Sequence, residues 1–479
     1  MKKLAGLLGL FLFTMVSNGQ ISFSNNFGKE NQEIGREILQ TQDGGYIMAG
    51  EVSGYPAEAV SSIYIVKTNS EGYLEWEKEI NNGYRVRATS MDYTKDGGYI
   101  LGGWYHGSGS LYTSDIIMVK MSEQGDTLWT KSFGGSKSDF AYSVKQMADD
   151  GFVIVGGTNY NGNSQAIIIK TDAYGDTIWT RMYGDEYFDI AESVHATPDS
   201  GCVVVGFTGI SDYEGDMLIL KYDKNGNEDW VTTIGGSLSQ WGYSVDLTSD
   251  NGYVVTGTTQ RLEGSIKLND FYWVKLNAAG EKVWDNQYSV INMHIGKSIK
   301  TTRDNGFIIG GSLNGQNDGY EYFLIKVDEE GEIEWTNKIE GANGNNYLNS
   351  VIQTIDNGYA FTGSAQDASF NSNGTNMVLF KTNSLGQMIY NQTTNINITT
   401  EPTRNVLYPN PAKVNQYVYL KDFDVQSIVW FNQLGIKIKE QSNVRNNKIV
   451  LDNFEPGIYY YYGFSEEKKK CFGKLIIIE

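Results

Sequence analysis

The chain has 479 residues, with 38 Lys and Arg against 57 Asp and Glu and a net charge of -19. This acidic balance argues against nucleic acid or an anionic membrane as the main partner, because both attract positive charge. Glycine is abundant (55 residues), aromatic residues make up 13% and proline is scarce (6 residues), which favours short strands joined by tight turns. The only cysteines are Cys202 and Cys471, so the chain is no disulfide scaffold, and we expect Cys202 to be a small core residue.

Residues 1–19 have the features of a signal peptide. Lys2 and Lys3 precede the apolar stretch Leu4–Val16, which is too short to span a bilayer. Small and polar residues follow, so cleavage is expected near Gln20. No later apolar run reaches transmembrane length. We therefore expect an exported chain without a membrane span once the signal peptide is removed.

A motif of the form acidic-x-Gly-aromatic recurs seven times at intervals of 50 to 54 residues. Its glycines are Gly45, Gly98, Gly151, Gly201, Gly252, Gly306 and Gly358. An apolar run ending in lysine follows each motif, at Lys67, Lys120, Lys170, Lys221, Lys275, Lys326 and Lys381. A polar turn with glycine comes next, at Gly72, Gly125, Gly175, Gly226, Gly280, Gly331 and Gly386. Each unit closes on an aromatic residue, at Trp76, Trp129, Trp179, Trp230, Trp284, Trp335 and Tyr390.

Each repeat is predicted to form four short strands. In the unit around Gly151 these are Ala141–Met147, Phe152–Gly157, Gln165–Thr171 and Thr177–Tyr183, all bounded by turn residues. A unit of this size cannot bury both faces of its sheet alone, so neighbouring units must stack. Radial closure is the usual solution, because it leaves only short edges. The sequence therefore predicts an all-β, seven-bladed β-propeller over residues 20–394.

The fourth strand of the repeat has one additional copy. Phe23–Gly28 matches Trp129–Gly134, which gives eight copies for seven units. One terminal copy is thus spare and can close the ring by pairing beside the other. An eight-bladed ring with a degenerate blade is the alternative.

The recurring residues are best explained by structure. Asp-Asn-Gly, as in Asp250–Gly252, could suggest calcium, but a tight hairpin turn that needs a positive φ is the favoured interpretation. No cofactor is predicted, and calcium binding is left open. The tryptophans are expected to pack between blades, and the lysines to lie at strand ends with exposed ammonium groups.

The motifs of this repeat resemble those of two groups of propeller proteins. Lys170-Thr-Asp172-x-x-Gly175-x-x-x-Trp179 resembles the tryptophan-docking repeat of quinoprotein-type propellers. Asp96–Ile100 with the following Gly-Gly pair is similar to short repeats of uncharacterised bacterial propellers. The resemblance covers residues 21–394 and implies the fold. Quinone-dependent dehydrogenases of the first group use adjacent cysteines and calcium, and this chain has no adjacent cysteines.

The composition changes after the seventh unit. A polar linker, residues 395–404, is followed by a segment that is predicted to form a small β-sandwich over residues 405–479. Its expected strands are Tyr417–Leu420, Ser427–Phe431, Lys448–Leu451, Gly457–Tyr462 and Lys474–Ile478.

Four motifs in this segment resemble the type A sorting domain of the type IX secretion system. The residues that carry the resemblance include Tyr408, Pro409, Asn410, Pro411, Gly435, Gly457, Tyr459 and Lys474. The resemblance implies that the type IX machinery is a partner and that the chain crosses the outer membrane. The protein is then either released or attached to the cell surface.

No catalytic or metal motif stands out. The three histidines, His106, His195 and His294, have no metal-ligand spacing, and no Gly-x-Ser-x-Gly or phosphate loop occurs. Antiparallel blades place the loops that vary between repeats on one face, opposite the Asp-Gly turns. These loops combine aromatic and small polar residues, as binding surfaces do. The candidate ligand-binding residues are Trp104, Tyr105, Tyr160, Tyr213, Trp241 and Tyr320.

The expected function is therefore non-catalytic binding of a glycan or protein through this loop face. The alternative is a secreted polysaccharide hydrolase or lyase that uses loop carboxylates such as Asp212 or Asp318 as acid and base. An aromatic shelf would favour binding, whereas paired carboxylates near the central axis would favour catalysis.

Overall fold

The computed structural model describes residues 22–388 except 29–31, 54–60, 82–84, 107–112, 161–162, 185–187, 212–213, 290–293, 316–318, 342–343 and 368–373, and parts of 403–478. The chain divides into two compact units, Met1–Ile389 and Tyr390–Glu479. The expected signal peptide lies outside the described residues, as does most of the expected linker.

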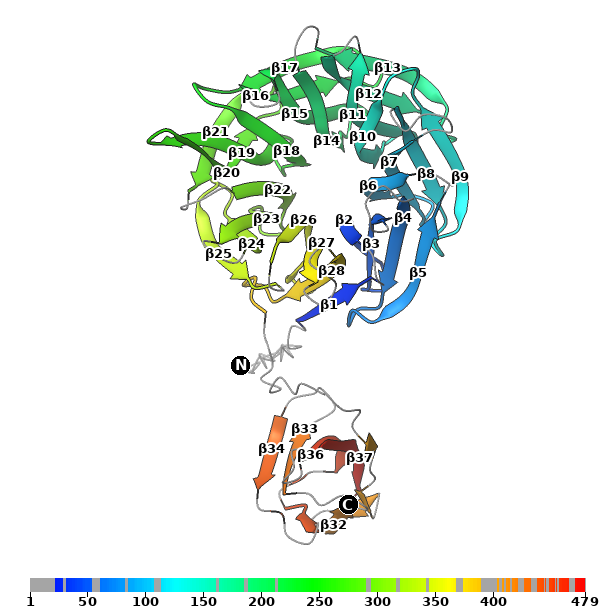
Figure 1. Cartoon of the computed structure of the whole chain (residues 1–479), viewed down its shortest axis with the longest axis vertical. Coiled ribbons are helices and arrows are strands. Elements are labelled where there is room, and N and C mark those ends of the chain that lie inside the picture. The colour runs from blue at the N-terminus through cyan, green and yellow to red at the C-terminus, as the bar shows by residue number, and fades with distance from the viewer. Residues whose placement is uncertain are drawn as a thin grey trace, which may run out of the picture. The chain divides into compact units, whose positions relative to one another are not determined.

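The first unit is a seven-bladed β-propeller, with four-stranded antiparallel sheets arranged around an axis (Figure 1). Blade 1 consists of β2 (Gln32–Gln40), β3 (Tyr46–Ser53), β4 (Ser61–Thr68) and β5 (Leu74–Ile80), and blade 2 of β6 (Val86–Tyr93), β7 (Tyr99–His106), β8 (Ser114–Met121) and β9 (Thr127–Phe133). Blade 3 consists of β10 (Asp139–Gln146), β11 (Phe152–Tyr160), β12 (Asn163–Thr171) and β13 (Thr177–Tyr183), and blade 4 of β14 (Phe188–Ala196), β15 (Cys202–Ser211), β16 (Glu214–Tyr222) and β17 (Glu228–Ile234). The four strands that were expected in the unit around Gly151 are thus confirmed.

The remaining blades follow the same order from the axis outwards. Blade 5 consists of β18 (Gln240–Leu247), β19 (Tyr253–Glu263), β20 (Ile266–Leu276) and β21 (Lys282–Tyr288), and blade 6 of β22 (His294–Thr301), β23 (Phe307–Gly315), β24 (Gly319–Val327) and β25 (Ile333–Ile339). Blade 7 contains β26 (Asn346–Gln353), β27 (Tyr359–Asp367), β28 (Gly374–Thr382) and β1 (Phe23–Phe27). The ring has seven blades, as predicted, and the eight-bladed alternative is not what forms.

The ring is closed by β1, the N-terminal copy of the fourth strand. It pairs antiparallel with β28, with Phe23 opposite Lys381 and Phe27 opposite Met377. Phe27 is buried in a core cluster that also contains Tyr46 and Tyr64 of blade 1. The first strand of the chain therefore completes the last blade, which confirms that the spare copy closes the ring.

Alternating side chains form the core between neighbouring blades. Val153 and Val155 of β11 pack in a cluster with Val204 and Leu220 of blade 4, whereas Ile154 packs in a cluster with blade 2. Successive residues of a strand point to opposite faces, so the apolar runs of the two middle strands serve both neighbours. Cys202 is fully buried in one of these clusters, as expected.

The tryptophans of the outer strands pack against the turn glycines of the next blade. Trp179 lies against Gly226, where an added Cβ would be 2.8 Å from the indole ring. Its Nε1 also donates a hydrogen bond to the carbonyl oxygen of Lys224 at 3.1 Å. Phe23 of β1 takes the same place against Gly72 of blade 1. The predicted packing between blades is confirmed, and it accounts for the glycine, which also has a positive φ of 77° at Gly226.

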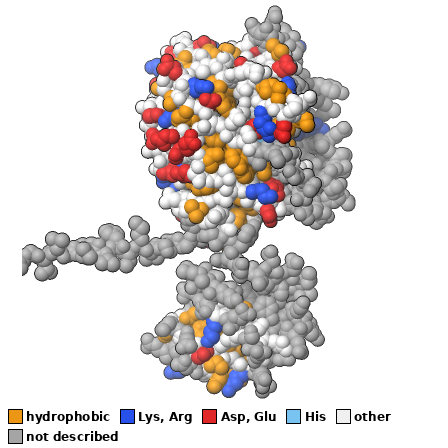
Figure 2. Space-filling model, turned by 90° about the vertical axis from the view of Figure 1, so that its left-hand side faces the viewer, with side chains coloured by type: hydrophobic (Ala, Val, Ile, Leu, Met, Phe, Trp, Pro, Cys, Tyr) orange, Lys and Arg blue, Asp and Glu red, His pale blue; other side chains and the backbone are white. Residues whose placement is uncertain are grey.

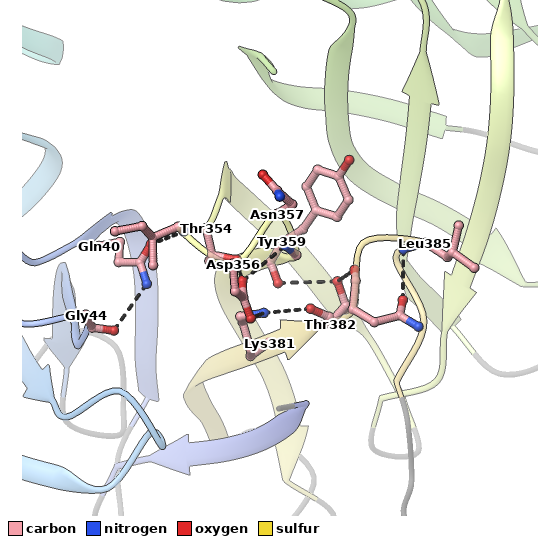
Figure 3. A network of polar contacts seen from close by, with 12 residues as sticks. Gln40, Gly44, Thr354, Asp356, Asn357, Tyr359, Lys381, Thr382 and Leu385 are labelled. Carbon is pink, nitrogen blue, oxygen red and sulfur yellow. Dashed lines mark hydrogen bonds and ion pairs between the residues drawn. The ribbon is translucent and has the colours of Figure 1, made fainter. Parts of the chain in front are cut away.

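The seven repeated lysines are buried, so the expectation of exposed ammonium groups is wrong. In each blade the lysine pairs with the aspartate of the turn between the first two strands. The pairs are Lys67–Asp43, Lys120–Asp96, Lys170–Asp149, Lys221–Asp199, Lys275–Asp250, Lys326–Asp304 and Lys381–Asp356. In blade 7 the Lys381 ammonium donates to Asp356 at 2.9 Å and to the Thr382 carbonyl oxygen at 2.8 Å (Figure 3). The lysine lies at the end of the third strand, as expected, but this end packs against the turn between the first two strands. The ion pair offsets the free-energy cost of burying the lysine charge.

The Asp-Asn-Gly segments are tight turns, as predicted. The residue before the repeated glycine has the positive φ, 64° at Asn251, while the Asp250 side chain accepts a hydrogen bond from the Gly252 N–H at 3.2 Å. Gly252 is required for a different reason. A Cβ there would lie 2.3 Å from the carbonyl oxygen of Leu276 on the neighbouring strand.

Acid should weaken the propeller through these turns. Hydrogen bonds from Thr248 and Lys275 lower the pKa of Asp250 to about 2. The carboxyl group of Asp250 has a lower pKa in the folded chain than in the unfolded chain, where it is near 4. Its ionised form therefore stabilises the fold at pH values above about 4, and this stabilisation is lost as the pH falls through about 2. We expect Asp250→Asn to lower the free energy of unfolding at pH 7 and to have less effect at pH 2. Urea unfolding at both pH values measures this, with the exposed Glu329→Gln as control, and an equal effect at both pH values would contradict it.

The second unit has two sheets around one core. One sheet has the order β29 (Thr403–Arg404), β37 (Lys470–Ile478), β36 (Gly457–Phe464), β33 (Ser427–Phe431), β34 (Lys437–Ser442), with β31 (Ala412–Lys413) also on β37. The other has the order β30 (Leu407–Tyr408), β32 (Tyr417–Leu420), β35 (Lys448–Val450). Trp430, Phe454 and Tyr461 are buried together in the core. The predicted small β-sandwich is thus confirmed, with its expected strands in place.

The residues of the sorting motifs lie mainly at strand positions. Tyr408 ends β30, Gly457 begins β36, and Lys474 in β37 pairs with Tyr460. The Tyr459 ring packs edge-on against Phe454 with a centroid distance of 5.0 Å. Pro411 is described and exposed, whereas Pro409, Asn410 and Gly435 lie outside the described residues.

Candidate functional site

A cavity of about 450 Å³ lies on the propeller axis and is lined by residues of all seven blades. Each innermost strand carries a β-bulge at the same position, where one residue is bypassed by the pairing with the second strand. A bulge re-aims the side chain that it inserts. The seven inserted residues, all of which line the cavity, are Arg36, Thr89, Tyr142, Glu192, Tyr243, Lys297 and Asn349.

In blades 2 to 7 the residue after the bulge is a serine that joins its blade to the next. In five neighbouring pairs of blades, a serine hydroxyl accepts a hydrogen bond from a backbone N–H of the following blade at 3.2 to 3.4 Å. The accepting serines are Ser90, Ser143, Ser193, Ser244 and Ser298. Ser350 of blade 7 instead donates to the Glu37 carboxylate of blade 1 at 2.6 Å. These bonds fix the spacing of the bulge residues around the axis.

Polar contacts join the inner strands between the bulges and the Asp-Gly turns. Lys145 and Asp92 are 3.2 Å apart, and His195 Nε2 lies 3.1 Å from Asp246. Burial opposes ionisation of Asp246, but the His195 hydrogen bond and the charge of Lys300 keep its pKa well below the usual range. His195 is thus part of a structural network in the inner strands.

Aromatic side chains line the end of the cavity that is nearer the variable loops. Trp104, Phe140, Tyr142 and Tyr243 belong to the lining. Trp104 packs edge-on against Phe140 with ring centroids 5.2 Å apart. Trp241 lies behind this wall, stacked parallel to Tyr243 at 6.0 Å. Flat rings beside polar groups form a surface on which the apolar face of a sugar could stack.

Charged groups in the cavity influence one another. Burial raises the pKa of Glu192, and the nearby Lys297 and Trp241 oppose this rise. Burial lowers the pKa of Lys297, with the charge of Glu192 acting against it and that of Arg36 adding to it. The Lys297 ammonium also lies over the Tyr243 ring, 3.6 Å from the centroid. The cavity can therefore offer a cation, a carboxyl group and aromatic faces to the same ligand.

The six predicted ligand-binding residues are not all brought together. Trp104 lines the cavity, and Trp241 supports its wall. Tyr105 packs against the core between blades 1 and 2. Tyr320 packs against Tyr347 with ring centroids 5.0 Å apart. Tyr213 and the side chain of Tyr160 lie outside the described residues, as do Asp212 and Asp318.

The bulge residues were not anticipated from the sequence. Their types differ in every blade, so they carry no repeated signal. The serines that follow do repeat, from Ser90 to Ser350, at the same intervals as the glycines of the Asp-Gly turns. This regular serine marks the innermost strand and could have indicated the preceding residue as a channel position.

The comparisons with known proteins assign the C-terminal unit to a family. Residues 406–478 match the family described as the secretion system C-terminal sorting domain. A search of curated proteins gave no match. Among the residues that the structure describes, no helix is suited to crossing a membrane.

Solved structures similar to this chain are propellers of varied function. They include Sqt1 from Chaetomium thermophilum, with 12% identity over 72% of this chain and 83% of that chain, and a TM-score of 0.43. A PL25 ulvan lyase has 11% identity over 76% of this chain and 96% of that chain, with a TM-score of 0.44. An α-L-arabinanase from Penicillium chrysogenum, complexed with arabinobiose, has 12% identity over 76% and 99%, with a TM-score of 0.45. Similarity this low does not extend to ligand or activity. The C-terminal unit, in contrast, is a type IX secretion sorting domain, and the protein that carries it is secreted or displayed on the cell surface.

Proposed function

We propose that the propeller binds a glycan, without cleaving it, at the loop end of its central cavity. The observation that carries the proposal is the lining of this cavity, where aromatic rings of Trp104, Phe140 and Tyr142 lie beside polar side chains of several blades. Aromatic faces and hydrogen-bonding groups together suit saccharides, which have both apolar faces and hydroxyl edges. Export through the sorting domain would bring this site to extracellular polysaccharide.

The carboxylates of the cavity favour binding over hydrolysis. Among the described residues, only Glu37 and Glu192 contribute carboxyl groups to the lining. Glu37 is engaged by Ser350, and Glu192 faces the charge of Lys297 from a different part of the ring. Most glycoside hydrolases use two carboxyl groups that flank the bond to be cleaved. The lining thus supports capture of a ligand, and cleavage remains an outcome that the experiment can detect.

Trp104→Ala should weaken glycan binding about tenfold or more, because it removes an aromatic face from the cavity. The test uses the chain from Gln20 to Glu479 on a panel of extracellular polysaccharides, with affinity measured by calorimetry and products by chromatography. Trp104→Phe should retain part of the affinity. Tyr174→Ala is the control, because Tyr174 is exposed on the opposite face. Unchanged binding in Trp104→Ala would reject the site, and shortened products would favour the hydrolase or lyase alternative.

A further inference from the structure

The cavity is lined by more basic than acidic side chains, although the chain as a whole is strongly acidic. Its net charge is -19, and acidic side chains gather on the outer side of the propeller (Figure 2). Two carboxylates, Glu37 and Glu192, belong to the cavity lining. Five basic residues belong to it, namely Arg36, Arg87, Lys145, Lys297 and Lys300. Such a concentration of positive charge favours an anionic ligand.

Carboxylates outside the lining hold several of these cations in place. Glu51 is buried and pairs with both arginines, with Oε1 2.6 Å from Arg36 and Oε2 2.7 Å from Arg87. Asp92 pairs with Lys145 in the same way. Each contact with Glu51 uses one nitrogen of a guanidinium that has five N–H donors. The arginines are thus fixed by a buried anion and keep donors for a ligand.

Lys297 differs from Arg36, Arg87 and Lys145, which each have a carboxylate partner. Among the described residues it has no carboxylate within ion-pair distance, and its ammonium lies over the Tyr243 ring instead. The bulge positions of blades 6, 7 and 1 place Lys297 and Arg36 on either side of Asn349. Their like charges repel, which helps to lower the pKa of Lys297. An anion between the two cations would relieve that repulsion.

We propose that the ligand is an acidic saccharide whose carboxylate or sulfate group lies between Arg36 and Lys297, with its ring against the aromatic wall at Trp104. This inference rests on the proposed glycan-binding function and adds the class of glycan. The volume of about 450 Å³ is typical of sites for small ligands, so it accommodates more than a free inorganic anion.

The experiment compares saccharides that differ only in charge. Oligogalacturonate is titrated against its methyl ester, and a sulfated galactan oligosaccharide against its desulfated form, by calorimetry with the chain from Gln20 to Glu479. We expect at least one acidic member to bind ten times or more tightly than its neutral partner. The affinity should fall as salt is raised, because the attraction is electrostatic.

Substitution of Lys297 tests the position of the acidic group. Lys297→Gln should remove most of the preference, so that the ratio of the affinities for the acidic and the neutral partner falls towards one. Lys297→Arg should keep the preference, because it retains the charge. Lys224→Gln is the matched control, because Lys224 is exposed in the turn between β16 and β17 on the opposite face.

The outcomes separate this inference from the function on which it rests. Equal affinity for charged and neutral partners would overturn the acidic ligand and leave glycan binding intact. A preference that survives in Lys297→Gln would overturn the assigned position. Competition by inorganic sulfate at the same affinity as the sulfated saccharide would overturn the requirement for a sugar. No binding by any member of the panel, with the fold intact by circular dichroism, would overturn both proposals.

Discussion

A chain that lacks β1 should unfold at a much lower temperature than the chain from Gln20 to Glu479. Deletion of residues 20–28 removes the outer strand of blade 7 and exposes the edge of β28, to which β1 pairs along its full length. It also removes Phe23 and Phe27 from their contacts with blade 1. A three-stranded terminal blade leaves the ring open and an unpaired edge that favours aggregation. Calorimetry and light scattering measure the two effects.

Single substitutions test the same closure with less disruption. Phe27→Ala should cost about 3 kcal/mol or more of unfolding free energy, because it deletes a buried aromatic ring from a packed core. Asn26→Ala is the matched control on the same strand, because Asn26 is exposed. If the deletion variant melted like the intact chain, the second copy of the fourth strand, around residue 390, would have to close the ring, and the assigned closure would be wrong.

Lys326→Met should destabilise the propeller by about 1 to 2 kcal/mol, because it removes a buried cation from two carboxylates that are about half exposed to solvent. Lys326 is only 2% exposed and lies 3.0 Å from Asp304 and 3.2 Å from Glu334. It also donates to the Val327 carbonyl oxygen at 2.9 Å. Methionine fills a similar volume, but it leaves two neighbouring carboxylates without their shared cation. The midpoint of urea unfolding measures the loss.

A second variant tests the electrostatic reason for that loss. Lys326→Met combined with Asp304→Asn should recover part of the stability, because it removes one of the carboxylates that lost their partner. Lys224→Met is the control, because it replaces an exposed lysine. A loss in Lys326→Met no larger than in this control would show that the ion pairs of Lys326 contribute nothing to stability.

The burial of the seven repeated lysines could not be predicted from the sequence. Aspartate and lysine recur together in every repeat, 21 to 25 positions apart, as in Lys170–Asp149 and Lys381–Asp356. Their pairing was nevertheless missed, because a lysine at a strand end is normally exposed. The pairing register of the first three strands of a blade places the lysine ammonium group against the turn between the first two strands, and this register is known only from the structure.

The repeat by itself determined the fold. Regular spacing of turn residues, apolar runs and tryptophans specifies blades of one kind, and such blades bury both faces by stacking, usually in a closed ring. The sorting motifs at the C-terminus likewise determined the destination of the chain. These features are local or periodic, so they can be read without coordinates.

The cavity and its chemistry were decided by the tertiary structure alone. Arg36, Glu192 and Lys297 stand in different repeats, far apart in the chain, and share only a bulge position. A propeller brings equivalent positions of all its blades to one axis, where residues that differ between repeats become neighbours. The residues that recur in every blade therefore determine the ring. The residues that differ between blades form the site, because closure of the ring brings their side chains within reach of one ligand.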